Sequence, residues 1–405
     1  IGTGYVGLPV GARFADFGNQ VHCVDKSAQK VGSINSGHMP IHEPDLQDIV
    51  ERNIAKKRLI FTTDIASVIP QADVIIIAVG TPTQSNSQHA DLTSLYTVGQ
   101  EIAQHLSSND GYKVIATKST VPVGTNEQLA TIIHEHNPSI EFDTVSIPEF
   151  LREGKAIEDF LHPDRIVIGV ETERAKTVLG ILYAPFTHQG IPILYCQRKS
   201  AEMIKYASNA FLGIKISFIN EISDLCETLD ADIREVKKGI GLDSRIGSQF
   251  LEPGPGFGGS CFPKDMLEII TTSKEMDSTL TIVDTAFQYN SNRSKIMTKK
   301  ILAVLGDMHQ EKKVSILGLS FKAGTDDIRM SPAIAIISTL LEKGISVAAY
   351  DPQSSKHFAN LFPEIEYTDT PYQAAQGSHA LVIITEWDEF KQLDFGMLAT
   401  IMKEK

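Results

Sequence analysis

The stretch Gly2-Thr3-Gly4-Tyr5-Val6-Gly7 opens the chain and leads directly into an apolar helical pattern that runs to about Phe17. A short strand-like segment, 20–24, follows and ends at Asp25. Glycines at these spacings allow a tight turn and a close approach to a pyrophosphate, which the N-terminus of the following helix attracts. By itself such a motif is as often a chance cluster of glycines, but here helix, strand and acidic residue follow at the expected distances. The stretch therefore predicts a dinucleotide-binding α/β domain.

Asp25 indicates which dinucleotide is bound. A carboxylate at the end of the second strand can accept hydrogen bonds from both hydroxyls of the ribose. The same charge repels a 2′-phosphate, which favours NAD over NADP as the cofactor. Lys26 lies next to Asp25 in the sequence and weakens this second inference.

The rest of the chain extends the α/β pattern. Apolar strands are expected at 72–79, 112–117 and 144–146, with helical stretches between them, which implies a parallel sheet. From 199 to 229 one long helix is predicted, because apolar residues recur at steps of three and four: Ile204, Ala207, Phe211, Ile214, Phe218, Ile222, Leu225 and Leu229. From Lys313 on, a strand, loop, helix and second strand ending at Asp351 echo residues 1–25.

These patterns predict an α/β protein with two Rossmann-like parallel-sheet domains joined by a mostly helical central domain with a long helix. A chain of 405 residues is too long for one hydrophobic core. We expect a first Rossmann-like domain over residues 1–197, a helical central and dimerisation domain over 198–305, and a second Rossmann-like domain over 306–405. The long apolar stripe is expected to pack at a two-fold interface between copies, so the protein is predicted to be a homodimer.

Composition excludes several classes of partner. A formal net charge of −13 argues against non-specific binding to nucleic acid or to an acidic membrane face, since basic patches supply most of that attraction. No apolar run approaches the ~20 residues needed to cross a bilayer. The four cysteines form no CxxC pair and are widely scattered, which favours a reduced, cytoplasmic setting.

The beginning of the sequence carries one further expectation. The chain starts at Ile1-Gly2 with no Met and no strand before the glycine turn. A dinucleotide-binding unit begins with a strand. We therefore expect a first strand upstream of residue 1.

A second glycine-rich stretch, Gly258-Gly259-Ser260-Cys261-Phe262-Pro263-Lys264-Asp265, surrounds one of the four cysteines. Pro263 suits the first turn of a helix, so Cys261 is expected at a helix N-terminus, where the helix dipole favours a thiolate. Asp265 lies four residues on, on the same helix face. A buried, inert cysteine is the common alternative, and it is the interpretation favoured for the remaining three, Cys23, Cys196 and Cys226.

Other polar positions are more ambiguous from spacing alone. Lys205 and Asn209 are four apart on the long helix and project to one side of it, as substrate-orienting groups or as solvated surface residues. Two loop-like clusters, 148–154 and 322–329, are either ligand loops or solvated turns. No His, Cys or carboxylate spacing supports a metal site, so none is predicted.

Taken together, these motifs resemble the UDP-glucose 6-dehydrogenase family. The resemblance covers nearly the whole chain in the right order, and its most specific part is the stretch 258–265. The other matching segments are Gly2–Gly7, Glu43-Pro44, Val79–Pro82, Ser119–Thr125, Pro148–Gly154, Lys205 with Asn209, Arg245–Gly247, and Thr325–Pro332. Two positions depart from the family pattern: Ile147 stands where Asn is usual, and Met330 where Glu is usual.

The resemblance implies a role for each matching residue. Cys261 is the implied nucleophile, assisted by Lys205, Asn209 and Asp265, while Thr120 and Glu149 position water and protons. The implied NAD contacts are Gly2, Gly4, Tyr5, Val6, Gly7, Asp25, Lys26, Thr81, Thr120, Glu153 and Arg329. The implied contacts to a UDP-sugar are Glu149, Phe150, Leu151, Lys205, Asn209, Phe250, Gly258 and Lys322, with Arg245 contributed by the second copy of a dimer. The second Rossmann-like domain is the implied UDP-sugar-binding domain.

The resemblance implies a four-electron oxidation of UDP-glucose to UDP-glucuronate with two NAD. A thiolate suits this chemistry, because it can trap the intermediate aldehyde and carry it on to a hydrolysable thioester. Three alternatives remain at this point. They are a dehydrogenase of another nucleotide sugar, such as a UDP-N-acetylhexosamine or GDP-mannose; a two-electron hydroxyacid-type dehydrogenase, which needs neither Cys261 nor a third domain; and a non-catalytic protein on a dehydrogenase fold.

Overall fold

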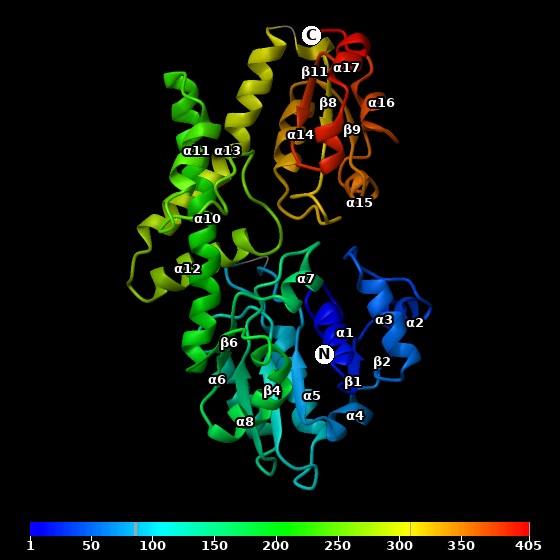
Figure 1. Ribbon diagram of the computed structural model, residues 1–405, viewed down its shortest axis with the longest axis vertical. Coiled ribbons are helices and arrows are strands. Elements are labelled where there is room, and N and C mark those ends of the chain that lie inside the picture. The colour runs from blue at the N-terminus through cyan, green and yellow to red at the C-terminus, as the bar shows by residue number, and fades with distance from the viewer. Residues whose placement is uncertain (85–86, 308, 405) are drawn as a thin grey trace. The chain divides into compact units, whose positions relative to one another are not determined.

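The computed structural model describes residues 1–84, 87–307 and 309–404. The chain forms two compact units, residues 1–207 and 208–405. Helix α10 (Arg198–Leu229) begins in the first unit and continues into the second (Figure 1).

The first unit contains two sheets. Strands β1 (Val21–Val24) and β2 (Leu59–Thr62) form a parallel pair. The second sheet has the order β3-β4-β5-β6-β7, with bounds Val74–Ile77, Lys113–Thr117, Phe142–Ser146, Ile166–Gly169 and Ile193–Cys196. Its pairs are parallel except β5–β6, which departs from the all-parallel sheet predicted. The backbone of Ile1 and Gly2 hydrogen bonds to both sheets, because Gly2 N donates to Val24 O and Ala78 N donates to Ile1 O.

Helix α1 (Gly7–Asp16) packs against both sheets because opposite sides of it are apolar. Leu8 and Ala12 join a core with β1 and β2, whereas Val10 and Phe14 join a core with β4 and β5. The other helices of this unit are α2 (Ala28–Asn35), α3 (Leu46–Ala55), α4 (Ile65–Val68), α5 (Thr93–His105), α6 (Thr125–His136), α7 (Ala156–Leu161), α8 (Glu173–Leu182) and α9 (Ala184–Thr187), with a 3-10 turn η1 (Ile69–Gln71). This arrangement fixes the glycine turn at the carboxyl ends of β1 and β3.

The second unit begins as helices and ends as a sheet. After α10 come α11 (Ile233–Gly241), α12 (Phe262–Glu275) and α13 (Thr281–Leu305). The sheet is parallel throughout in the order β10-β9-β8-β11, with bounds Glu366–Tyr367, Ser346–Tyr350, Lys313–Leu317 and Ala380–Ile383. In sequence order this is 3-2-1-4, the arrangement of a Rossmann-type half. The predicted fold class is thereby confirmed.

Helices cover both faces of this sheet (Figure 1). Helix α14 (Pro332–Glu342) and the end of α13 bury Ile336, Ile337 and Leu340 with Ile301 and Leu305 on one face. Helices α16 (Pro371–Ala375) and α17 (Phe395–Ile401) pack with Leu317 on the other. The remaining elements are α15 (Ser355–Ala359) and the 3-10 turns η2 (His309–Glu311) and η3 (Asp388–Gln392).

Helix α10 exposes several large apolar side chains and buries several polar ones. Its large apolar side chains Phe211, Phe218, Leu225 and Leu229 are exposed, whereas its buried side carries polar residues that include Asn209, Ser217 and Asn220. The predicted helix is present, and five of the eight residues of its predicted stripe are exposed, whereas Ile204, Ile214 and Ile222 are half-buried and Ile214 packs against a core with Phe257. A contiguous row of exposed apolar residues marks an interaction surface.

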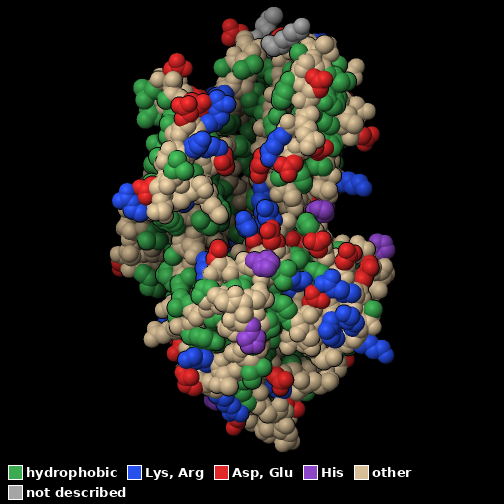
Figure 2. Space-filling model, viewed as in Figure 1, with side chains coloured by type: hydrophobic (Ala, Val, Ile, Leu, Met, Phe, Trp, Pro, Cys, Tyr) green, Lys and Arg blue, Asp and Glu red, His purple; other side chains and the backbone are tan. Residues whose placement is uncertain are grey.

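The surface carries charges of both signs. On the face shown in Figure 2, acidic and basic side chains are interspersed. Within the described residues, no helix is both long enough and apolar enough to cross a membrane. Among the described residues, no three or more His, Cys, Asp or Glu side chains are placed to hold a metal ion.

Candidate active site

The glycine turn is compact because two of its glycines approach other backbone closely. A Cβ on Gly7 would lie 1.9 Å from Gly2 O, and Gly2 itself has φ +93°. The space at Gly4 is open, with nothing within 4 Å of a Cβ there. Tyr5 and Val6 complete the turn before α1 begins at Gly7. The N-terminus of α1 thus presents its amides at an accessible glycine, which suits a pyrophosphate.

Asp25 ends β1 and is tied to the glycine turn. Its Oδ2 accepts hydrogen bonds from Thr3 N at 3.0 Å and Thr3 Oγ1 at 2.7 Å. Burial by itself raises the pKa of this carboxyl, but hydrogen bonds from Ser27, Thr3 and Lys30 outweigh it and lower the pKa to about 2. The carboxylate is therefore charged under all ordinary conditions, as recognition of ribose hydroxyls requires.

The cation beside Asp25 is Lys30, which the sequence analysis missed. Its Nζ lies 3.0 Å from Asp25 Oδ2, whereas the neighbouring Lys26 is exposed. Ser27 could have indicated the position of Lys30 from the sequence. It caps α2, which places Lys30 in the first turn of that helix. Lys30 is therefore the basic group nearest the discriminating carboxylate in the structure.

Two predicted threonines meet at the carboxyl ends of adjacent strands. Thr81 follows β3 and Thr120 follows β4, and Thr81 Oγ1 donates to Thr120 O at 2.8 Å. Ser119 Oγ donates to Val79 O at 2.7 Å and joins the same two segments. The carboxyl edge of a parallel sheet is where such folds bind their ligands.

Glu202 on α10 supports the loop that follows Thr120. Its carboxylate accepts hydrogen bonds from Gly124 N at 2.7 Å, Asn126 N at 3.0 Å and Asn126 Nδ2 at 2.7 Å. Burial raises the pKa of Glu202 above its ordinary value, although these hydrogen bonds act to lower it. No motif predicted this residue, although it lies three positions before Lys205 and so on the same side of the helix.

Glu149 and Lys205 form a buried ion pair. Lys205 Nζ donates to Glu149 Oε1 at 2.9 Å, and the side chains are 4% and 5% exposed. Glu149 Oε2 accepts from Leu151 N at 2.6 Å, and the Phe150 ring centroid lies 5.3 Å from Lys205 Nζ. The structure thus brings together four residues predicted from two separate motifs.

Lys118 is a second buried lysine at this place, and the sequence analysis did not single it out. It immediately follows β4, and its side chain is almost fully buried. Burial lowers the pKa of Lys118 to about 8. The positive charge of Lys205 also lowers this pKa, whereas the negative charge of Glu149 raises it. Its adjacency to Ser119-Thr120 was the available signal.

The loop 148–154 is held by Glu43, whose carboxylate accepts from Gly154 N at 2.9 Å and from Ile157 N at 3.3 Å. Glu153, a predicted NAD contact, is half-buried within this loop. The departure at Ile147 has a structural reason, since its side chain is 1% exposed and packs in the core with α1 and α8. Ile147 therefore acts through packing.

The second unit carries the predicted nucleophile. Cys261 occupies the N-cap position of α12, and Pro263 lies in the first turn. Asp265 is 1% exposed; its Oδ2 accepts from Asn209 Nδ2 at 2.6 Å and its Oδ1 from Lys264 Nζ at 2.7 Å. Cys261, Asp265 and Asn209 are thus assembled by α10 and the start of α12. Lys264 belongs to the same cluster, though only its neighbours had been assigned roles.

The glycines before Cys261 face the segment that contains Arg329. Gly259 N donates to Arg329 O at 2.8 Å, and a Cβ on Gly258 would lie 2.2 Å from Met330 O. The guanidinium of Arg329 forks onto Asp327, with contacts of 2.7 to 2.9 Å, and its side chain is 53% exposed. Met330, the second departure from the family pattern, is exposed and has φ 53°.

The other predicted substrate contacts of the second unit are more scattered. Arg245 lies in a turn after α11, not in a helix; it forks onto Asp243, and its side chain is 87% exposed. Phe250 has φ 62° and its ring centroid lies 6.1 Å from that of Phe262. Lys322 Nζ lies 5.7 Å from the Phe321 ring centroid. Within the single chain Arg245 therefore lies at the surface, bonded to Asp243.

Asp351 lies at the end of β9 as Asp25 lies at the end of β1, and each carboxylate accepts backbone hydrogen bonds from the loop beside it. Asp351 Oδ2 accepts from Leu319 N, Ser320 N and the indole Nε1 of Trp387 at 2.7, 3.1 and 3.1 Å. The carboxylate thus fixes the loop after β8. The two carboxylates differ in that Asp351 also accepts from an indole, whereas Asp25 pairs with Lys30.

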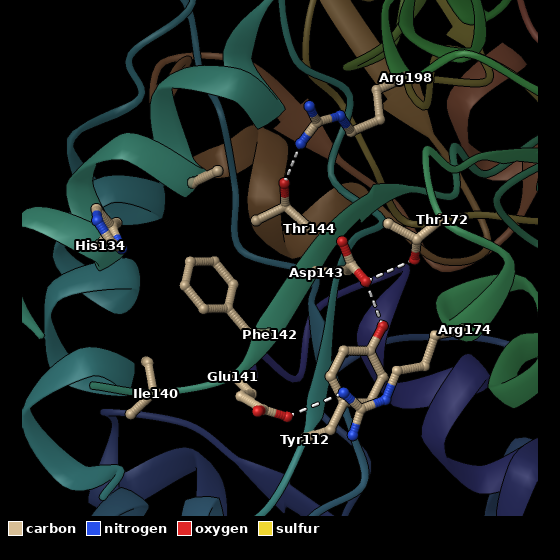
Figure 3. A pocket seen from close by; sticks show the side chains of 11 residues that line it. Tyr112, His134, Ile140, Glu141, Phe142, Asp143, Thr144, Thr172, Arg174 and Arg198 are labelled. Carbon is tan, nitrogen blue, oxygen red and sulfur yellow. Dashed lines mark hydrogen bonds and ion pairs between the residues drawn. The ribbon is translucent and has the colours of Figure 1, made fainter. Parts of the chain in front are cut away.

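A surface groove of about 510 Å³ lies elsewhere in the first unit. Figure 3 shows Tyr112 and Thr172 both donating to Asp143, at 2.5 and 2.6 Å, while Arg174 pairs with Glu141. Tyr112 precedes β4 and Phe142 begins β5, so the groove lies at the amino ends of these strands. Cofactors bind at the opposite, carboxyl ends, and we assign no ligand to the groove.

Comparison with known proteins matches three parts of the chain to one family. The models of the UDP-glucose/GDP-mannose dehydrogenase family match with their NAD binding domain over residues 1–187, their central domain over 199–292 and their UDP binding domain over 315–405. The NAD-binding domain and its cofactor, predicted from the glycine turn, are thus confirmed.

Full-length relatives agree with these domain matches. The UDP-glucose 6-dehydrogenase of Rhizobium meliloti is 48% identical over 100% of this chain and 92% of its own length, and TuaD of Bacillus subtilis, also a UDP-glucose 6-dehydrogenase, is 43% identical over 100% and 86%. The solved structure of a UDP-glucose dehydrogenase from Pyrobaculum islandicum has a TM-score of 0.93 at 33% identity, covering 100% of this chain and 95% of that one. The chain belongs to the UDP-glucose/GDP-mannose dehydrogenase family.

Proposed function

We propose that the chain oxidises the C6 alcohol of UDP-glucose to the carboxylate of UDP-glucuronate, with two NAD consumed for each sugar. The observation that carries the proposal is the assembly of Cys261, Asp265 and Asn209 at the start of α12, in a chain 48% identical along its whole length to a UDP-glucose 6-dehydrogenase. A two-electron dehydrogenase needs no thiol at such a position.

The glycine turn and Asp25 fit NAD, because an accessible helix N-terminus and a charged carboxylate suit its pyrophosphate and ribose. In this proposal Gly2, Gly4, Tyr5, Val6, Gly7, Asp25, Lys26, Thr81, Thr120, Glu153 and Arg329 contact the cofactor. Held by these residues, NAD would supply the hydride acceptor for both oxidations at C6.

The chain's own residues then act on C6 in sequence. The Cys261 thiolate adds to the aldehyde carbon to give a thiohemiacetal, which loses a hydride to become a thioester. Water, positioned by Thr120 and Glu149, attacks the thioester carbon, releasing the acid and returning the proton to the thiol sulfur. The ammonium of Lys205 and the amide of Asn209 stabilise the oxyanion that develops on the C6 oxygen.

The UDP-sugar is proposed to contact Glu149, Phe150, Leu151, Lys205, Asn209, Phe250, Gly258 and Lys322, with the UDP portion held by the domain over 306–405. The domain limits 1–197, 198–305 and 306–405 are part of this proposal.

We further propose that the protein is a homodimer. The exposed stripe Phe211, Phe218, Leu225 and Leu229 supports this proposal. In the dimer, Arg245 of each copy contributes to the active site of the other. A cytoplasmic location is proposed because none of the four cysteines, all of which lie in the described residues, forms a disulfide.

A substrate panel tests the function. UDP-glucose, UDP-N-acetylhexosamines and GDP-mannose are each incubated with the purified chain and NAD, and NADH absorbance and product mass are followed. We expect UDP-glucose to be the preferred substrate, with two NADH formed per acid. One NADH per sugar with accumulating aldehyde would replace the proposal with a two-electron dehydrogenase, and preference for another sugar would change the substrate.

A further inference from the structure

The loop that leads to Cys261 is held by side chains with no assigned role. Three polar residues from α10 and α13 hydrogen bond to the backbone of residues 254–257; we call Asn220, Asn290 and Arg293 the loop clamp. Asn220 Oδ1 accepts from Gly254 N at 2.7 Å, and Arg293 Nε donates to Gly254 O at 3.0 Å. Gly254 is thus bound through both of its backbone groups.

Asn290 binds the other end of the loop in the same two-sided way. Its Oδ1 accepts from Phe257 N at 2.8 Å and its Nδ2 donates to Phe257 O at 3.0 Å. An amide that serves both groups of one residue fixes the position and the orientation of that backbone. Gly256 lies against it with φ +114°, and a Cβ there would be 2.9 Å from Asn290 Oδ1.

The clamp is itself rigidly built. Asn220 and Arg293 are 1% and 2% exposed, and Arg293 Nη1 donates to both carboxylate oxygens of Asp224. Tyr289 donates to the same carboxylate at 2.7 Å. The guanidinium of Arg293 is therefore held in one geometry, because its displacement would leave these buried donors and acceptors unsatisfied.

The segment between the loop clamp and Cys261 is short and closely packed. Only three residues lie between Phe257 and Cys261, and two of them, Gly258 and Gly259, are packed against Met330 and Arg329 backbone. The Phe257 ring also packs edge-on against Phe262, the first residue of α12, with ring centroids 5.9 Å apart. A shift of Phe257 is therefore transmitted to the position of Cys261 at the helix N-terminus.

We propose that Asn290 is a positioning residue for Cys261: by holding both backbone groups of Phe257 it keeps the thiol at the N-terminus of α12 and its sugar adduct aligned for the second oxidation. The part that concerns the adduct rests on the proposed function. The part that concerns the thiol does not.

Asn290→Ala tests both parts, with Asn292→Ala as the matched control on the same helix. Asn292 is exposed, and its amide donates to Gln288 O within the helix. In the absence of sugar, iodoacetamide should modify Cys261 of Asn290→Ala roughly tenfold more slowly at pH 7, because the thiolate loses the helix N-terminus. The pH midpoint of that reaction should rise, while Asn292→Ala should match the wild type.

Turnover gives the second readout. A misplacement of about 1 Å costs up to roughly 100-fold in rate, so kcat of Asn290→Ala should fall 10- to 100-fold. The KM for NAD should stay unchanged, and NADH per sugar should drop from two toward one, with free aldehyde trapped by hydroxylamine. If the variant does not fold, Gly256→Ala, which disturbs the same contact from the loop side, takes its place.

The outcomes separate the two proposals. An alkylation profile equal to that of Asn292→Ala overturns the positioning role. A reduced kcat with the ratio still at two and the profile unchanged overturns it too, because that is the effect of a merely structural residue. A wild-type ratio of one refutes the proposed function alone, since the alkylation readout needs no turnover.

Discussion

Lys205 Nζ and Glu149 Oε1 lie 2.9 Å apart in a pair that is almost completely withdrawn from solvent. The two residues come from positions 56 apart in the chain, one from α10 and one from the loop after β5. A buried pair of this kind is costly to desolvate and costly to break, so it is weak evidence for stability. A functional role explains its presence better.

Glu149→Gln is expected to stall the reaction after the second oxidation. The amide keeps the shape and an acceptor for Lys205 but cannot take a proton from water. Loss of general base catalysis slows hydrolysis about 100-fold or more. The covalent sugar adduct on Cys261 should then accumulate and be visible by intact mass spectrometry. Unchanged kcat without an adduct would remove Glu149 from the hydrolytic step.

Lys118→Met should stabilise the protein at neutral pH. Burial lowers the pKa of Lys118 to about 8 from the ordinary lysine value of 10.5. Below pH 8 the folded protein bears the cost of a buried ammonium; between pH 8 and 10.5 the unfolded chain binds more protons, so this group's contribution to stability rises with pH. The variant's advantage in urea unfolding should therefore be largest at pH 7 and shrink by pH 10.5. A pH-independent difference would contradict the lowered pKa.

Asp25 should make NAD the preferred cofactor by about 100-fold or more in kcat/KM, because juxtaposed like charges cost several kcal/mol. Lys30, at 3.0 Å, offsets part of that repulsion. Asp25→Ser should lower kcat/KM for NAD and narrow the difference from kcat/KM for NADP, whereas Gln29→Ser, on an exposed side chain of α2, serves as the control. Comparable use of both cofactors by the wild type would refute the role of Asp25.

Cys261→Ala should abolish acid formation while NAD binding, measured by cofactor titration, persists, because the glycine turn and Asp25 lie in the other unit. In the wild type, alkylation should reach Cys261 first. Cys23 is buried, and burial raises the pKa of its thiol to about 11 and raises that of Cys196 as well. Retained turnover in Cys261→Ala would rule out the covalent mechanism.

Mixed dimers test the role of Arg245. Its side chain is 87% exposed and bonded only to Asp243 among the described residues of its own chain. Arg245→Ala and Cys261→Ala should each be nearly inactive alone. Co-expressed, they form heterodimers in which one site carries both lesions and the other none, restoring about a quarter of wild-type sites under random pairing. If proven heterodimers stay inactive, Arg245 does not act across the interface.

The sequence by itself determined the local features. The glycine turn with Asp25, the helix after Cys261 with Pro263 in its first turn, and the period of α10 all follow from short-range rules of turn, capping and periodicity. These features sufficed for the fold class and the candidate nucleophile. They depend on residues near one another in the chain, which is why one sequence revealed them.

Only the tertiary structure decided which side of each element faces inward and what meets there. Periodicity located the stripe of α10, yet the folded chain buries the opposite side, because Glu202, Lys205 and Asn209 find partners in three segments far away in sequence. Asn290 gave no motif for the same reason, because the backbone that it binds at Phe257 lies 33 residues away. A buried polar side chain is stable only when distant donors or acceptors satisfy it, and those distances are fixed by packing rather than by spacing.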